Sequence, residues 1–109
     1  MTQALIWFLS IFFLIGTFTN GYGPQTIREG YARWGYPSWF RYVTALLELA
    51  VALLLLFPAG IGWGAILGMG VMAAAHLTLL HHRETLQSIG PAVVFALLAL
   101  VLWQVTLPS

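Results

Sequence analysis

The segment RYVTALLELAVALLLLFPAGIGWGAILGMG (residues 41–70) decides the fold, because it contains two long apolar stretches separated by a very short break. Each stretch, with its flanking residues, approaches the roughly 20 apolar residues that a helix needs to cross a bilayer. The break is Pro58-Ala59-Gly60, since proline cannot continue a helix and glycine favours helix ends. A connection this short predicts that the two helices lie antiparallel and adjacent.

Apolar segments of similar length lie on both sides of this stretch. The sequence therefore predicts an all-α membrane protein, with residues 1–109 forming a single four-helix transmembrane bundle. Asn20 to Pro24 reads as a turn that ends the first helix, and Pro91 suits the first turn of the fourth helix. The four spans are expected at residues 3–19, 39–57, 61–80 and 91–107.

The composition excludes a water-soluble globule and several classes of function. Hydrophobic residues make up 61% of the chain and charged residues only 6%, whereas soluble domains carry about 25% charged residues. The net charge of +1 offers no basic surface for nucleic acid. The chain has no cysteine, which excludes disulfides, thiolate nucleophiles and cysteine-ligated metals within it. Lipid is therefore the expected solvent for most of the surface.

All the arginines lie in or beside two of the three connections between the spans. Arg28, Arg33 and Arg41 flank the first connection, and Arg83 lies in the last. Connections rich in positive charge stay on the cytoplasmic side of a membrane. The sequence therefore predicts a multi-pass protein of the cell (inner) membrane, with both termini outside and the first and last connections in the cytoplasm.

The first connection is long enough to hold structure of its own. Thr26 and Glu29 have the spacing of a helix-capping box. Ile27, Tyr31 and Trp34 then recur at helical intervals. This pattern predicts either a short amphipathic helix on the membrane surface or an ordered cytoplasmic loop.

Glu48 is the first candidate for a functional residue, because it lies near the middle of the second span. An acidic residue at the centre of a membrane helix costs roughly 2.5–3.5 kcal/mol on insertion scales, so it faces the bundle interior or a watery cavity. Thr44 lies one turn earlier on the same face, and helix lengths place Ser10 of the first span at the level of Glu48. Glu48 is interpreted as a ligand anchor or proton carrier, or alternatively as a hydrogen-bonded structural residue.

His76 in the third span is the second candidate. Helix geometry places it about 9 Å from the level of Glu48 and nearer to Thr44 and Thr17, so a ligand or a water would have to link it to the carboxyl group. Functional and structural roles for His76 both remain open. The same helix carries small residues at four-residue intervals that let another helix approach closely, namely Gly60, Gly64 and Gly68.

The remaining polar residues support narrower expectations. Arg41, at the start of the second span, is expected to anchor at the interface or to contact the anionic end of a ligand. His81, His82 and Glu84 supply too few converging ligands, so no metal site is predicted. The sequence contains no nucleotide-binding, zinc-protease or nucleophile motif. Catalytic residues are therefore unassigned, and an enzyme acting on its own is not expected.

Several of these stretches resemble the DoxX-like family. The resemblance is carried by residues 34–44, by Glu48-Leu49-Ala50, by the leucine-rich run 53–58 and by residues 64–76. It implies a compact four-helix membrane bundle in which Glu48 is the family's characteristic acidic position. Relatives in the wider DoxX group are linked to quinone-coupled sulfur oxidation and to oxidative-stress membrane assemblies. Relatives often carry a basic residue at the end of the first helix, where this chain has residues 16–20 without one.

Three functions follow as hypotheses. In the first, the bundle binds a small hydrophobic ligand, a lipid or a quinone, and acts as an accessory to a larger membrane process. The residues expected at that site are Glu48, His76, Thr44, Arg41, Thr17 and Ser10. In the second, the chain is the membrane subunit of a quinone-linked oxidoreductase, with Glu48 carrying protons and a partner redox protein supplying electrons. In the third, glycine-mediated packing builds a homo-oligomer or docks another membrane protein.

Overall fold

The fold consists of helices, as the sequence predicts. The computed structural model describes residues 2–106, which contain no strand. In chain order the elements are α1 (Thr2–Tyr22), α2 (Gln25–Arg33), α3 (Phe40–Leu56), the 3-10 turn η1 (Pro58–Gly60), α4 (Ile61–His81) and α5 (Thr85–Thr106). Of the two alternatives for the first connection, the structure has the short helix, α2. The predicted end of the last span at Leu107 lies outside the described residues.

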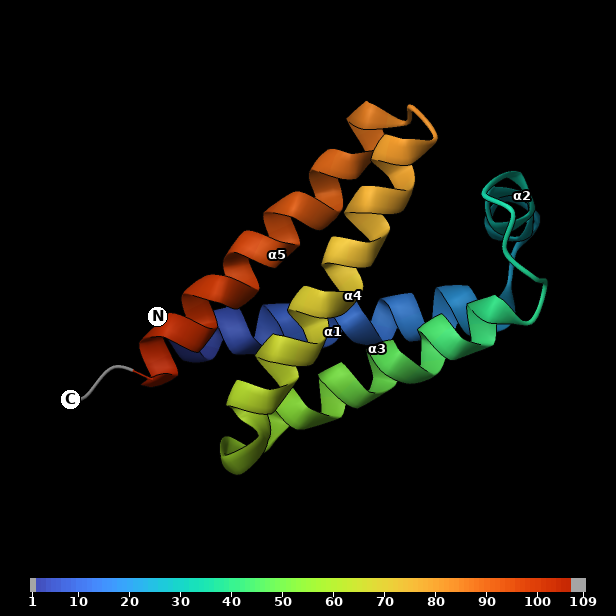
Figure 1. The fold of residues 1–109 in the computed structure, drawn as a ribbon. Coiled ribbons are helices and arrows are strands. Elements are labelled where there is room, and N and C mark those ends of the chain that lie inside the picture. The colour runs from blue at the N-terminus through green and yellow to red at the C-terminus, as the bar shows by residue number, and fades with distance from the viewer. Residues whose placement is uncertain (1, 107–109) are drawn as a thin grey trace.

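The long helices form two pairs. α1 lies beside α3, α4 lies beside α5, and α3 contacts α4 across the turn η1 (Figure 1). The turn reverses the chain because Pro58 cannot extend α3, as the short break in the sequence indicates. The helix α2 lies beyond the end of the first pair, and the start of α1 lies near the end of α5 (Figure 1).

The core lies where the two pairs meet. A methyl group on Gly68 of α4 would lie 2.9 Å from Leu98 of α5 and 3.1 Å from Val51 of α3, so α4 contacts both neighbours there through its bare backbone. A methyl group on Gly64 would lie 2.9 Å from the Cβ atom of Leu54. The fully buried apolar side chains come from all four long helices and include Leu9, Phe13, Val51, Leu55, Ala65, Leu98 and Val101.

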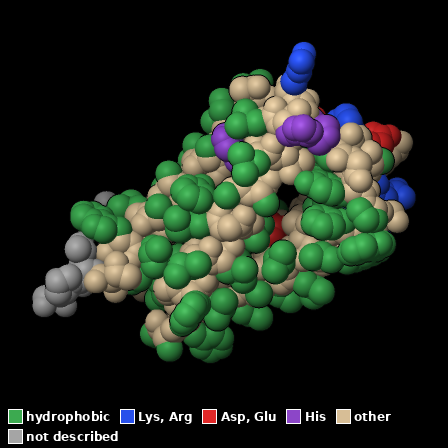
Figure 2. All heavy atoms as spheres, in the orientation of Figure 1, with side chains coloured by type: hydrophobic (Ala, Val, Ile, Leu, Met, Phe, Trp, Pro, Cys, Tyr) green, Lys and Arg blue, Asp and Glu red, His purple; other side chains and the backbone are tan. Residues whose placement is uncertain are grey.

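Large apolar side chains also cover the outside of the molecule. Phe18 on α1 is 76% exposed, Leu46 on α3 is 68% exposed and Trp63 on α4 is 71% exposed. Apolar side chains cover much of the face in Figure 2, whereas arginine and histidine side chains gather at one end of it. An apolar surface of this extent is suited to lipid rather than to water.

Among residues 2–106, three segments are long and apolar enough to cross a membrane. They are Gln3–Tyr22, Pro58–His81 and Thr85–Thr106. The predicted second span corresponds to α3, which has 17 residues and a length of about 25 Å at 1.5 Å per residue. The fold is therefore an all-helical one with three long candidate spans and a shorter apolar helix between them.

The first helix does not end at the turn predicted to begin at Asn20. The helix α1 continues through Asn20 and Gly21 and ends after Tyr22. The backbone leaves the helix at Gly23, whose φ of +68° is in the left-handed region that glycine tolerates best. The predicted turn thus begins about three residues later than expected.

The predicted start of the fourth helix is also wrong. The helix α5 begins at Thr85, so Pro91 lies inside it. A proline in a helix interior removes a backbone donor, and neighbouring helices in a membrane can bond the carbonyl groups that this leaves free. The carbonyl group that Pro91 leaves without its helical donor is that of Gln87. The adjacent carbonyl group of Ser88 accepts a hydrogen bond from His76 on α4 (3.0 Å).

The capping box expected at the start of α2 is absent. Pro24 occupies the N-cap position, and no side chain there caps the helix. Thr26 lies within the first turn, and the side chain of Gln25 donates a hydrogen bond to Glu29 instead (2.9 Å). The helix begins two residues too early for the Thr26–Glu29 pair to act as a capping box.

Candidate functional site

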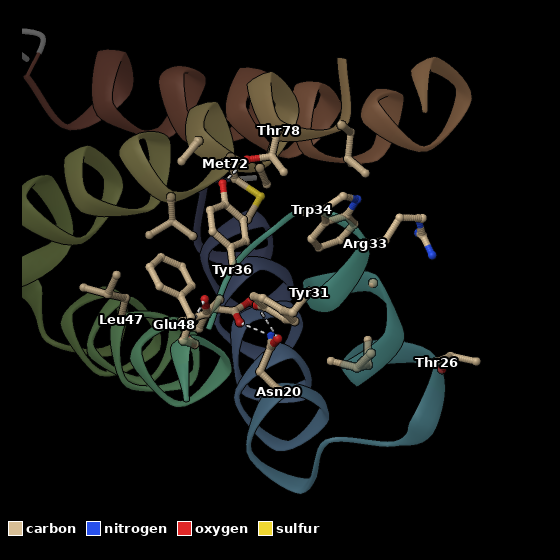
Figure 3. Close-up of a pocket in the computed structure, with 18 residues that line it drawn as sticks. Asn20, Thr26, Tyr31, Arg33, Trp34, Tyr36, Leu47, Glu48, Met72 and Thr78 are labelled. Atoms are coloured by element: carbon tan, nitrogen blue, oxygen red, sulfur yellow. Dashed lines mark hydrogen bonds between the residues drawn. The ribbon is translucent and has the colours of Figure 1, made fainter. Parts of the chain in front are cut away.

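Glu48 lies inside the molecule, at one end of a row of hydrogen-bonded side chains from three helices. Only 5% of its surface is exposed. The Asn20 side-chain nitrogen on α1 donates to the Glu48 carboxyl group (2.6 Å) and also to the carbonyl group of Gly16 (3.0 Å). The Tyr31 hydroxyl group on α2 donates to the Asn20 side-chain oxygen (2.8 Å). Figure 3 shows this row, which links α2, α1 and α3.

The carboxyl group of Glu48 lies directly against the backbone of α1. A methyl group added at Gly16 would lie 2.1 Å from Glu48 Oε2, a distance that no real contact allows. Gly16 therefore leaves the space that the carboxyl group occupies.

Burial raises the pKa of Tyr31, which lies outside the long helices, so its hydroxyl group keeps the proton that it donates to Asn20.

The prediction that Glu48 lies at the same depth in the bundle as Ser10 of the first helix is wrong. Glu48 lies opposite Gly16 and Asn20 rather than opposite Ser10. Ser10 is buried, and its hydroxyl group has no hydrogen-bond partner among the described residues. The Thr17 hydroxyl group donates to the carbonyl group of Phe13 in its own helix (2.9 Å). The structure brings neither Ser10 nor Thr17 to the carboxyl group.

A cavity of about 340 Å³ adjoins Glu48. It lies between α2, α3 and α4, and Asn20 closes one side of it (Figure 3). Thr44 also lines it, one turn before Glu48 on the same face of α3. The walls are otherwise largely apolar or aromatic, with Tyr31, Trp34, Tyr36, Phe40, Leu47 and Met72 among them. The volume falls in the range of about 300–1,000 Å³ that is typical of small-molecule sites.

Aromatic side chains hold the segment between α2 and α3 over this cavity. The rings of Tyr36 and Phe40 stack, with their centroids 4.7 Å apart. The rings of Tyr31 and Trp34 meet edge to face at 5.5 Å. The Tyr36 hydroxyl group is 2.7 Å from the hydroxyl group of Thr78 on α4. The cavity is thus covered by a connection that is itself tied to the opposite helix pair.

Arg41 does not line the cavity. It holds the end of α1, which carries Asn20. One of its terminal nitrogens donates to the carbonyl groups of Asn20 (3.0 Å) and Gly21 (2.8 Å) at the end of α1. The other donates to the hydroxyl group of Tyr42 (2.6 Å). The guanidinium group lies so close to Gly23 that a methyl group there would be 2.2 Å from it. Arg41 therefore fixes the end of α1 against α3, where Asn20 meets Glu48.

His76 faces α5 rather than the cavity. Its Nδ1 atom donates to the Ser88 carbonyl group (3.0 Å), and this ring nitrogen carries a proton because a carbonyl group can only accept. The cavity lining includes Ala75 but not His76. The structure therefore places His76 at a helix contact, apart from Glu48, and no cluster of three potential metal ligands occurs within residues 2–106.

Glu84 joins α2 to the connection between α4 and α5. The Arg33 side chain donates to one of its carboxylate oxygens (2.6 Å), and the indole nitrogen of Trp34 donates to the other. Arg33 is 56% exposed, so solvent screens this ion pair strongly. These contacts close the edge of the cavity that faces the connection between α4 and α5. The sequence alone indicates no such contact for Glu84.

The contact at Glu84 is expected to depend on pH. The hydrogen bond from Trp34 and the charge and hydrogen bond of Arg33 lower the pKa of Glu84. A lowered folded-state pKa means that the contact stabilises the fold above the ordinary glutamate pKa and is lost as the pH falls through the lower folded value. Tryptophan fluorescence recorded from pH 7 to pH 3 should show a transition that Glu84→Gln lacks. A transition of equal size and position in the variant would contradict the assignment.

The sequence alone did not identify Gly16, Asn20 and Tyr31 as parts of the site. One signal was present, because Gly16 and Asn20 are four residues apart and share one face of α1.

Comparison with models of protein families matches residues 4–102 to the DoxX-like family. No curated protein and no solved structure matches the chain.

Proposed function

The chain belongs to the DoxX-like family of membrane proteins, and on that premise we propose that it binds a small hydrophobic molecule in the cavity beside Glu48. The supporting observation is a buried carboxyl group at an otherwise largely apolar cavity of ligand size. In the proposal, the polar end of the molecule lies near Glu48 and Thr44. Its apolar part contacts side chains such as Phe40, Leu47 and Met72.

The proposal includes a fourth crossing by α3. In support of this, Glu84 contacts Arg33 and Trp34, which favours α2 and the end of α4 lying on the same side of the membrane. The helix α3 begins on that side, after α2, and ends at η1, where α4 begins on the opposite side. If α4 spans the bilayer, α3 must cross it as well. Its 17 residues lie at the lower end of the range of about 17–25 for spanning helices.

With four crossings, the arginines all lie on one side of the membrane. Arg28 and Arg33 lie in α2, Arg41 lies at the start of α3, and Arg83 lies in the connection between α4 and α5. The excess of positive charge favours the cytoplasm for this side. Both termini then face outward, in an inner or plasma membrane.

Lipids and quinones are the proposed ligand classes, because both combine a polar group with a long apolar part. The proton-carrier alternative is weaker, since Asn20 has no titratable group and lies between Glu48 and Tyr31. The assembly alternative is also weaker, because Gly64 and Gly68 pack against α3 and α5 within the chain. A homo-oligomer or a partner redox protein stays a prediction.

Ligand binding is tested by the thermal stability of the purified protein in detergent. Adding decylubiquinone, or separately a phospholipid, should raise the unfolding temperature, because a ligand at 100 times its Kd stabilises by about 2.7 kcal/mol. Glu48→Gln should lose most of this shift. The matched control is Glu29→Gln, an exposed site outside the cavity, which should keep the full shift. Saturation with both compounds without any shift, or an unchanged shift in Glu48→Gln, would count against the proposal.

A further inference from the structure

A second hollow lies outside the bundle, where α1 ends and α2 begins. Its volume is about 510 Å³. The residues that line it are Tyr22, Gly23, Pro24, Gln25, Arg28 and Arg41. None of them belongs to the lining of the cavity beside Glu48, so the two sites are separate.

Two guanidinium groups line this groove without a carboxylate. The guanidinium group of Arg28 makes no hydrogen bond or ion pair with the residues that the structure describes. Arg41 is fixed by the carbonyl groups at the end of α1 and by Tyr42, whose ring centroid lies 4.1 Å from the guanidinium carbon. These partners carry no full negative charge. The positive charge of both arginines therefore remains uncompensated.

The donors of Arg41 are only partly used. Its described hydrogen bonds occupy Nη1 twice and Nη2 once, whereas a guanidinium group has five N–H donors. One Nη2 hydrogen and the Nε hydrogen remain for another acceptor. Because Arg41 is held in place, these donors are oriented before any ligand arrives, and less side-chain entropy is lost on binding.

The groove lies where a phospholipid headgroup would be. It adjoins the last residue of the candidate span Gln3–Tyr22, and Tyr22 is 85% exposed at this end. Tyrosine at a span end marks the interfacial region of a bilayer. The planar guanidinium group matches the oxygens of a phosphate group. The positive charge of the groove, the geometry of its N–H donors and its position at the end of a span therefore all favour the phosphate group of a lipid.

We propose that this groove binds the phosphodiester headgroup of an anionic phospholipid, through Arg28 and Arg41. The lipid would contact the end of α1 and the start of α2 together. Its headgroup would therefore stabilise the position of α2 relative to the long helices. This site is independent of the ligand proposed for the cavity beside Glu48.

The proposal is tested by lipid retention in detergent, measured by native mass spectrometry. The protein is purified in dodecyl maltoside and titrated with phosphatidylglycerol or with phosphatidylcholine. We expect phosphatidylglycerol to be retained preferentially. Arg28→Gln should weaken that retention about fivefold, the effect of one cationic contact at a membrane surface. The exposed position of Arg28 lets the variant fold normally, which circular dichroism verifies.

The matched control is Arg83→Gln, which removes one positive charge at the same end of the molecule but outside the groove. It should leave phosphatidylglycerol retention unchanged. Equal losses in Arg28→Gln and Arg83→Gln would show general charge attraction and overturn the site. Equal retention of the two lipids would overturn it as well. Displacement of the lipid by millimolar glycerol phosphate would reassign the groove to soluble anions.

Discussion

Asn20→Ala is expected to lower the free energy of unfolding by about 1–3 kcal/mol, the cost of leaving buried polar groups without partners. The substitution removes the amide that donates to Glu48 and accepts from Tyr31. Glu48 is 5% exposed and Tyr31 8% exposed, so water replaces the lost bonds poorly. Detergent unfolding followed by circular dichroism measures the change. The ligand-induced shift in unfolding temperature should fall with it.

Two variants make this result specific. Thr19→Ala is the control, because its hydroxyl group is exposed and bonds only within its own helix. It should change stability by less than about 0.5 kcal/mol. Tyr31→Phe removes one end of the row, and combining it with Asn20→Ala should cost less than the sum of the two. Full additivity, or an Asn20→Ala variant as stable as the wild type, would show that the row does not act as a unit.

Gly16→Ala is expected to destabilise the protein by about 1–3 kcal/mol, as overpacking of a filled interior does. Its methyl group would lie 2.1 Å from Glu48 Oε2, so either the carboxyl group or α1 must move. Moving the carboxyl group also breaks its hydrogen bond with Asn20. The loss outweighs the gain of up to about 1 kcal/mol that alanine brings to a helix.

A double-mutant cycle identifies the clash as the cause. In a Glu48→Ala background, the same change at Gly16 should cost much less, with a coupling of about 1 kcal/mol or more. Gly21→Ala is the control in the same helix, because nothing lies within 4 Å of a methyl group there. It should be neutral or stabilising. An equal cost of Gly16→Ala with and without Glu48 would contradict the close contact.

Much of the fold can be predicted from the sequence, because lipid imposes simple demands on it. The apolar runs and the break at Pro58 to Gly60 locate the long helices to within a few residues. The errors fall where local signals conflict. Asn20 and Gly21 favour a turn, yet α1 continues through them, since Asn20 bonds back to Gly16 and Arg41 bonds to their carbonyl groups. Pro91 favours a helix start, yet α5 begins six residues earlier, at Thr85.

The candidate site is less predictable, because its members come from different helices. Glu48 stands out in the sequence, and Thr44 follows from its position one turn away. Asn20, Tyr31 and Gly16 carry no comparable signal. A displacement of three residues in the end of α1 also shifts every estimate of which residues share a level. The pairing of His76 with Ser88 depends equally on how α4 and α5 meet.

The sequence by itself determines that hydrocarbon surrounds this chain and that its one mid-helix carboxyl group faces inward. Both follow from the free energy of transferring side chains between water and lipid, which depends on residue type and position along a helix. Only the tertiary structure decides that an amide on α1 holds the carboxyl group and that a cavity opens beside it. Those features depend on the rotation and length of each helix, to which transfer free energies are insensitive.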